Sequence, residues 1–167
     1  MIFRFGNYTL DVDVERTRAF YERDDVKTTS EQCVCQGCQN YDGAILTASA
    51  TVLDFLRSMG IDPRKPAEVF NVTGMQEADG TIWYNGWFHV CGTLVESPET
   101  VNETMHENGS RSLSYRWELG YRPDPDYPFV LLPTREISLL PEGFPAPALE
   151  LEMDTRLPWV LSAPYEL

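Results

Sequence analysis

The stretch Cys33-Val34-Cys35-Gln36-Gly37-Cys38-Gln39-Asn40-Tyr41 is the feature around which the rest of the chain is organised. It holds three of the four cysteines among 167 residues, and the fourth, Cys91, lies far downstream in an aromatic, strand-like segment. Cysteines this close together are typical of a metal site, of thiol chemistry or of a disulfide. Helical patterns lie on both sides of the stretch and strand patterns come after them, so it is expected to join a helical layer to a sheet.

The first 60 residues carry mostly helical patterns. After a β-hairpin predicted over residues 2–12, Asp13 can cap a short helix that reaches Tyr21. Residues 23–32 are polar and predict a loop, and residues 39–46 have room for one or two helical turns. The clearest helix begins near Ser49. Its apolar stripe is Val52, Leu53, Phe55, Leu56 and Met59. Gly60 and Pro63 then end that helix, because glycine favours a helix C-terminus and proline blocks its continuation.

The chain after residue 66 has the character of a sheet. Strands are predicted at 69–72, 82–95, 113–121, 129–132 and 149–153, with a tight turn at Asp79-Gly80 and a second turn or a bulge at Asn85-Gly86. Residues 96–111 are poor in apolar groups and predict a long, mobile loop. In a regular strand, Trp87, His89 and Cys91 point to the same face.

These patterns predict an α+β fold in which helices from the first 60 residues pack on a mainly antiparallel sheet. The length favours one domain over residues 1–167. In the last long strand, acidic residues alternate with apolar ones, which predicts that the acidic side chains face solvent. These side chains are Glu150, Glu152 and Asp154. The apolar face of the sheet is expected to hold Trp83, Tyr115, Trp117, Leu149 and Leu151.

The composition argues against several classes of function. A net charge of −13 repels nucleic-acid phosphates, so a general DNA- or RNA-binding role is not expected. Surface charge of this kind mostly serves solubility. Binding of a basic partner, or mimicry of a nucleic acid, is also compatible with it. No signal peptide and no membrane-length apolar run is visible, which predicts a cytoplasmic protein without membrane contact. Disulfides are rare in that compartment.

The cysteine pattern predicts a metal site, and zinc is the metal it fits best. Zinc takes four tetrahedral ligands, commonly thiolates and imidazoles. Cys33, Cys35 and Cys38 supply three of them, Cys91 is the expected fourth, and His89 is a rival or additional ligand. The spacing fits the usual pair of C-x2-C motifs only in part, and an iron–sulfur cluster fits less well. A closed site of this kind stabilises a fold, which predicts a non-catalytic module that binds a protein or a small ligand.

Other functions remain open from the residues alone. Cys35-Gln36-Gly37-Cys38 is a C-x-x-C pair that can cycle between dithiol and disulfide, although no βαβ unit of the thioredoxin type is evident. Three ligands with an open position would suit a metal-dependent hydrolase. The cysteines can also be small buried hydrophobes. The sequence therefore leaves open whether the protein is an enzyme.

Motifs along nearly the whole chain support one resemblance. They are Cys-x-Cys-x-x-Cys-x-Asn-Tyr at 33–41, Gly60-Ile61-Asp62-Pro63-Arg64-Lys65-Pro66-Ala67-Glu68-Val69, Tyr84-Asn85-Gly86-Trp87-Phe88-His89 and Leu157-Pro158-Trp159-Val160-Leu161. The sequence resembles a family of uncharacterised bacterial proteins, a domain of unknown function. The resemblance implies a bacterial, single-domain protein, and it implies no reaction.

Overall fold

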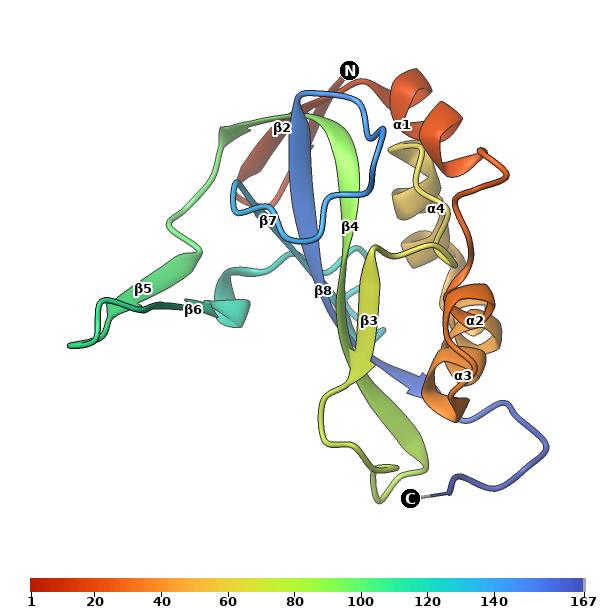
Figure 1. Ribbon diagram of the computed structural model, residues 1–167. Helices are drawn as coiled ribbons and strands as arrows, with labels where there is room; N and C mark the ends of the chain where they lie inside the picture. The colour runs from red at the N-terminus through yellow and green to blue at the C-terminus, as the bar shows by residue number, and fades with distance from the viewer. Residues whose placement is uncertain (167) are drawn as a thin grey trace.

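The computed structural model describes residues 1–166, and the predicted α+β class is confirmed (Figure 1). Four helices lie in the first 60 residues, and a mainly antiparallel sheet comes after them. The helices are α1 Val14–Tyr21, α2 Thr29–Gln32, α3 Gln36–Ala44 and α4 Ala50–Ser58, with a short 3-10 turn, η1, at Ile45–Thr47. The strands are β1 Ile2–Phe5, β2 Tyr8–Val12, β3 Glu68–Asn71, β4 Thr81–Glu96, β5 Val101–Met105, β6 Arg111–Tyr115, β7 Phe129–Thr134 and β8 Ala148–Pro158, with a second 3-10 turn, η2, at Trp117–Leu119.

Strand β4 is the central strand of the sheet and pairs with three other strands, β2, β3 and β8. One of its edges pairs antiparallel with β8 from Thr81 to Cys91. Its other edge pairs with β3 near its start and with β2 near its end, so that the strand order is β1-β2-β4-β8-β7 with β3 beside β4. The expected turn at Asn85-Gly86 does not occur. Instead, Gly86 allows β3 to lie close, because a Cβ there would approach the Glu68 carbonyl oxygen to 2.4 Å.

A gap between β2 and β3 leaves part of β4 without a neighbouring strand, and α1 fills it with side-chain hydroxyls. The Tyr21 hydroxyl accepts from the His89 backbone N–H at 3.2 Å and donates to the His89 carbonyl at 2.8 Å. One turn earlier, the Thr17 hydroxyl accepts from the Cys91 N–H at 2.9 Å. The helix therefore satisfies the buried backbone groups that a strand would otherwise pair with.

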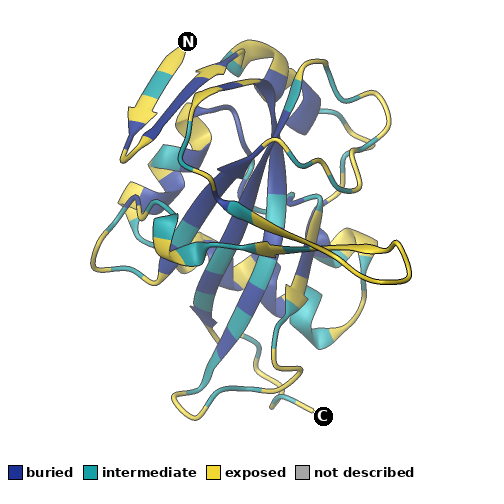
Figure 2. Cartoon of the chain, turned by 90° about the vertical axis from the view of Figure 1, so that its left-hand side faces the viewer, coloured by how far each residue is buried: buried dark blue, intermediate teal, exposed yellow. Residues whose placement is uncertain are grey.

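The core lies between the helices and one face of the sheet (Figures 1 and 2). Alternate residues of β4 and β8 point into it. They are Ile82, Tyr84, Phe88 and Val90 from β4 and Leu149, Leu151, Met153 and Leu157 from β8. The expected position of Leu149 and Leu151 on the apolar face is correct, but the position expected for Trp83 is wrong. Trp83 lies half-buried on the opposite, outer face, because strand alternation separates it from Ile82 and Tyr84.

The segment predicted as a long loop is instead a two-stranded ribbon. Strands β5 and β6 pair with each other and project from the body, largely exposed (Figures 1 and 2). The strand predicted over 113–121 ends at Tyr115 and is followed by η2, so Tyr115 and Trp117 lie outside the main core. Within residues 1–166, no helix is long and apolar enough to cross a membrane.

Candidate metal centre

The three clustered cysteines lie where one short helix ends and the next begins. Cys33 comes directly after α2 in an extended conformation, Cys35 is the N-cap of α3, and Cys38 lies in the first turn of α3. Their sulfur atoms all lie within 4.8 Å of one another. Cys33 Sγ and Cys35 Sγ are 3.2 Å apart, and Cys35 Sγ accepts from the Cys38 backbone N–H at 3.4 Å. The three thiols are therefore close enough to bind one metal ion.

Local capping chemistry explains why the chain turns at this point. Thr28 and Glu31 form a capping-box pair, in which the Glu31 carboxylate accepts from the Thr28 backbone N–H at 2.7 Å and begins α2. The loop predicted over residues 23–32 is thus partly helical. The Thr-x-x-Glu spacing is the sequence signal that could have revealed α2.

A buried carboxylate fixes α2 against α3. Asp42 in α3 accepts from the Ser30 backbone N–H in α2 at 3.2 Å and also from the Ser30 hydroxyl. Arg64, in the connector after α4, donates to the same oxygen at 3.4 Å. Cys33 comes directly after α2 and Cys38 lies in α3, so this contact sets the relative positions of two of the three sulfurs.

The other side of α3 anchors the cysteine loop to the sheet. Asn40 is fully buried, donates to the Tyr84 hydroxyl at 3.2 Å and to the Pro158 carbonyl at 3.1 Å, and accepts from the Val160 N–H at 2.8 Å. The Tyr84 hydroxyl in turn donates to the Gly37 carbonyl at 2.8 Å. The loop that carries the thiols is therefore held by β4 and by the end of β8.

The three thiols differ in exposure and in acidity. Cys35 is exposed, whereas Cys33 and Cys38 are half-buried. Hydrogen bonds from the Cys35 backbone and from the neighbouring thiols lower the pKa of Cys33. Burial, followed by the neighbouring thiols, raises the pKa of Cys38. Because a metal binds thiolates, loading this site must release protons and must become stronger as pH rises.

A cavity of about 710 Å³ lies beside the cluster. The three cysteines line one side of it, and the edge strand β3 and the C-terminal segment line the rest. The lining from those two segments includes Glu68, Phe70, Asn71, Tyr165 and Glu166. A group bound to a metal from outside the chain therefore has space beside the thiols.

The structure does not bring Cys91 or His89 to this cluster. The cysteine loop docks on β4 at Tyr84, and Cys91 is seven residues further along that strand, which corresponds to about 23 Å. Cys91 and His89 also lie on the outer face, whereas Tyr84 faces the helices. Cys91 is buried, with its sulfur 3.9 Å from the Ala146 carbonyl oxygen. Among residues 1–166, no other His, Cys or carboxylate joins the group of three.

His89 belongs instead to a buried polar group that the sequence did not reveal. Its Nε2 lies 3.0 Å from Glu150 Oε2, which also accepts from the Ser138 backbone N–H at 2.6 Å. Glu152, two residues after Glu150, is 6% exposed and Glu150 is fully buried, so neither belongs to a solvated row as expected. Burial raises the pKa of both carboxyls, that of Glu152 to about 8, and burial lowers the pKa of His89 to about 4.

Comparisons of the chain with family models, with curated proteins and with solved structures find no match. The resemblance to a bacterial family therefore stays a prediction, and any proposal about function rests on the geometry of the chain itself.

Proposed function

We propose that Cys33, Cys35 and Cys38 bind one zinc ion and that the protein is a metal-stabilised binding module. The observation that carries this proposal is the convergence of three sulfur atoms within 4.8 Å of one another. Thiolate ligands suit zinc, and thiolates also suit cuprous copper, so the test includes both metals.

Three ligands leave a fourth tetrahedral position for water or for a group from a partner. The cavity beside the thiols offers room for such a group. This arrangement favours a site that recognises a protein side chain or a small ligand. A metal-dependent enzyme with an open position remains the alternative, and it would need a substrate in the same cavity.

Metal loading is tested by stoichiometry and by stability. Protein purified without chelators is expected to contain about one zinc per chain, and removing it with a chelator is expected to lower the melting temperature. Reconstitution with zinc and with cuprous copper, each in competition with a chelator, identifies the preferred metal. Well under one metal per chain, with no gain in melting temperature on reconstitution, would overturn the proposal.

Thiol redox chemistry is the second candidate function, and one observation favours it. Cys35 is exposed at the N-cap of α3, whereas Cys38 is half-buried with a raised pKa, which resembles an attacking thiol beside a resolving thiol. The position of the C-x-x-C motif in the fold argues against redox chemistry. Helix α2 precedes the motif, whereas thioredoxin-like motifs lie in a βαβ unit.

Alkylation of the protein with and without bound zinc separates the two candidates. A redox pair requires one thiol that reacts rapidly near neutral pH and a disulfide that forms reversibly with a measurable reduction potential. The zinc proposal instead predicts that zinc protects all three thiols from alkylation. Rapid alkylation that zinc does not slow would favour the redox function.

A further inference from the structure

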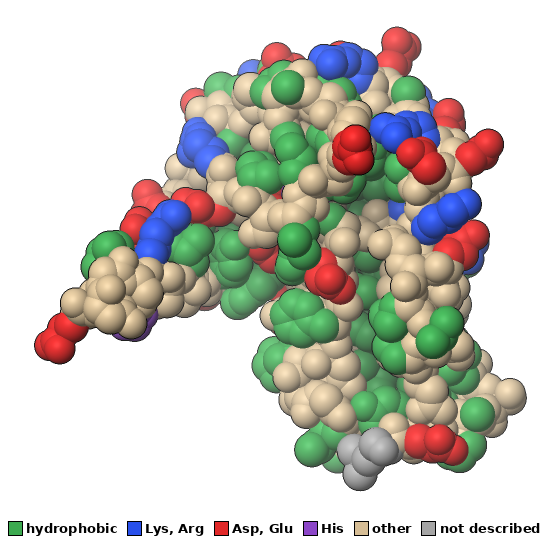
Figure 3. Space-filling model, viewed as in Figure 1, with side chains coloured by type: hydrophobic (Ala, Val, Ile, Leu, Met, Phe, Trp, Pro, Cys, Tyr) green, Lys and Arg blue, Asp and Glu red, His purple; other side chains and the backbone are tan. Residues whose placement is uncertain are grey.

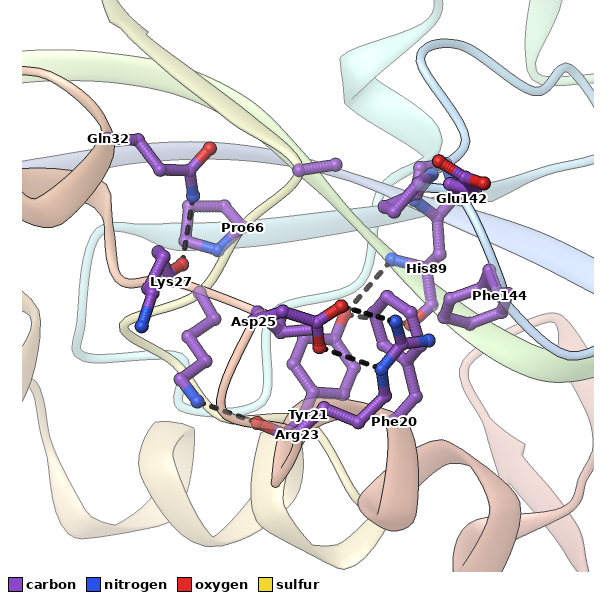
Figure 4. A pocket seen from close by; sticks show the side chains of 14 residues that line it. Phe20, Tyr21, Arg23, Asp25, Lys27, Gln32, Pro66, His89, Glu142 and Phe144 are labelled. Atoms are coloured by element: carbon purple, nitrogen blue, oxygen red, sulfur yellow. Dashed lines mark hydrogen bonds and ion pairs between the residues drawn. The ribbon is translucent and has the colours of Figure 1, made fainter.

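A second cavity, of about 280 Å³, opens where β4 lacks a neighbouring strand (Figure 4). Its walls come from the end of α1 and the segment after it, from Gln32 at the end of α2, from residues 65–67, from His89 and from residues 141–144. It shares no lining residue with the 710 Å³ cavity, although Gln32, Pro66 and Ala67 also line a smaller cavity that reaches Cys33 and Cys38. A ligand bound here would therefore not need the metal centre.

Much of the cavity wall is apolar or aromatic. Phe144 packs against Phe20 with ring centroids 4.7 Å apart and against the His89 ring at 5.7 Å. The apolar lining also includes Tyr21, Val26, Pro66 and Ala67. Ligand sites commonly combine such walls with a few polar groups, and this volume is near the small end of their range of about 300–1,000 Å³.

The charged groups at the cavity give it local positive charge in a chain whose net charge is −13. Arg23 is already neutralised, because its guanidinium contacts both Asp25 carboxylate oxygens, at 2.9 and 2.5 Å. The Lys65 ammonium donates to the Tyr21 carbonyl at 2.7 Å. Within residues 1–166, no carboxylate pairs with Lys27 or with Lys65.

Glu31 lies outside the cavity lining but close enough to Lys27 and Lys65 to interact with both by charge, while its carboxylate accepts from the Thr28 backbone N–H. Glu142 is exposed and lies on the loop over 141–144, away from Lys27 in Figure 4. His89 is 1% exposed, and burial lowers its pKa to about 4, so it is neutral at pH 7. Its Nδ1 has no hydrogen-bond partner among residues 1–166. Figure 3 shows Lys and Arg side chains interspersed with Asp and Glu side chains over α1 and the segment after it, so the positive charge is confined to the cavity lining.

We propose that this cavity binds a small carboxylate attached to an apolar or aromatic group. The carboxylate would lie at Lys27 and Lys65, and the apolar part would pack against Phe20 and Phe144. The apolar walls favour an organic carboxylate over a free inorganic anion, whose whole surface requires polar partners.

Three single-ring probes of similar size test the charge preference. Benzoate, benzyl alcohol and benzylamine are titrated separately into the full-length protein, and binding is followed by chemical shift changes of the backbone amides. Benzoate is expected to cause saturable shifts around Lys27, Lys65 and Phe144, the alcohol weaker ones and the amine none. The same result is expected with and without zinc, which separates this proposal from the metal centre.

Variants locate the binding site. Lys27→Gln is expected to weaken benzoate about threefold, the order of an exposed ion pair. Arg122→Gln removes the same charge from an exposed position outside the cavity and should leave the affinity unchanged. Ala67→Leu fills the cavity without changing its charge and should abolish the saturable shifts.

Four results would overturn the proposal. These are the absence of saturable shifts at millimolar benzoate, binding of benzylamine as tightly as benzoate, equal weakening by Arg122→Gln and Lys27→Gln, and unchanged binding in a folded Ala67→Leu protein.

Discussion

Neighbouring residues of the cysteine stretch have different tasks. The three thiols face solvent and a cavity, whereas Asn40 and Tyr41, shortly after them, are fully buried. The Tyr41 hydroxyl donates to the Pro63 carbonyl at 3.0 Å, and its ring meets the Tyr84 ring edge-on. The part of the motif after the cysteines therefore anchors the site and does not form it.

Asn40→Ala should destabilise the protein because it removes three hydrogen bonds made by a fully buried side chain. They join Asn40 to the Tyr84 hydroxyl, the Pro158 carbonyl and the Val160 N–H, and the Tyr84 hydroxyl keeps another bond, to the Gly37 carbonyl. The free energy of unfolding, measured with urea on the metal-free protein, should fall by about 1–3 kcal/mol. Gln39→Ala changes the exposed neighbour and should cost less than about 0.5 kcal/mol. Equal effects of the two variants would contradict the anchoring role.

Asp42 positions the thiols through α2 and is not among the residues proposed to bind the metal. Asp42→Ala frees the Ser30 N–H and should lower zinc affinity about tenfold, the size seen when outer partners of ligands are removed. Asp54→Ala, an equal change of charge at an exposed site in α4, should leave the affinity unchanged. Chelator competition measures both. Unaltered zinc affinity in a folded Asp42→Ala protein would show that α2 is placed by other contacts.

At the scale of elements, α1 acts as part of the sheet as well as a covering helix. Tyr21→Phe removes the hydroxyl that pairs with both the His89 N–H and the His89 carbonyl. The free energy of unfolding should fall by about 1–3 kcal/mol. Tyr121→Phe is the matched control, since the Tyr121 hydroxyl makes no hydrogen bond to a described residue. A Tyr21→Phe protein as stable as this control would contradict the account.

The elements differ in how far the sequence predicts them. The helix over 50–58 and the strand alternation of β4 and β8 follow from apolar spacing, which is a local signal. Strand β5 does not, because it lacks the apolar face that such patterns detect. Strand β6 is reached only in part by the strand predicted over 113–121, which ends at Tyr115 in the structure. The cysteine cluster was predictable because its members are close in sequence. The positions of Cys91 and His89 depend on strand facing and register, which spacing alone does not fix.

At the scale of the whole molecule, the main surprise is a covered outer face. Glu150 and Glu152 alternate with leucines as solvated residues do, yet the chain around Ser138 and Tyr115 covers them. The local sequence pattern does not predict that these glutamates are buried, because the segments that cover them are distant in sequence. The result is two neighbouring carboxyls in a low-dielectric environment, which favours their protonated forms.

This carboxyl pair predicts that stability declines with rising pH. Burial, and then the neighbouring Glu150, raise the pKa of Glu152 from 4.5 to about 8, while Tyr115 and His89 oppose this shift. The folded state therefore holds a proton that the unfolded state releases, so the contribution is complete below pH 4.5 and is lost as pH rises through about 8.

Glu152→Gln mimics the protonated acid and should flatten this decline. Its free energy of unfolding should change less between pH 5 and pH 9 than that of the unmodified protein. Glu99→Gln, at an exposed position, should keep the original slope. Parallel pH profiles for Glu152→Gln and the unmodified protein would contradict the raised pKa.

Cys33, Cys35 and Cys38, and not Cys91 or His89, are proposed to hold the metal. The most direct measurement is metal content per chain, together with the sulfur-to-cobalt charge-transfer absorption after loading with Co²⁺, in single variants. Cys33→Ser, Cys35→Ser and Cys38→Ser should each lose most of the metal and of that absorption, whereas Cys91→Ala and His89→Gln should retain one metal per chain. Metal that is retained in the first three variants, or lost in a folded Cys91→Ala protein, would contradict the account.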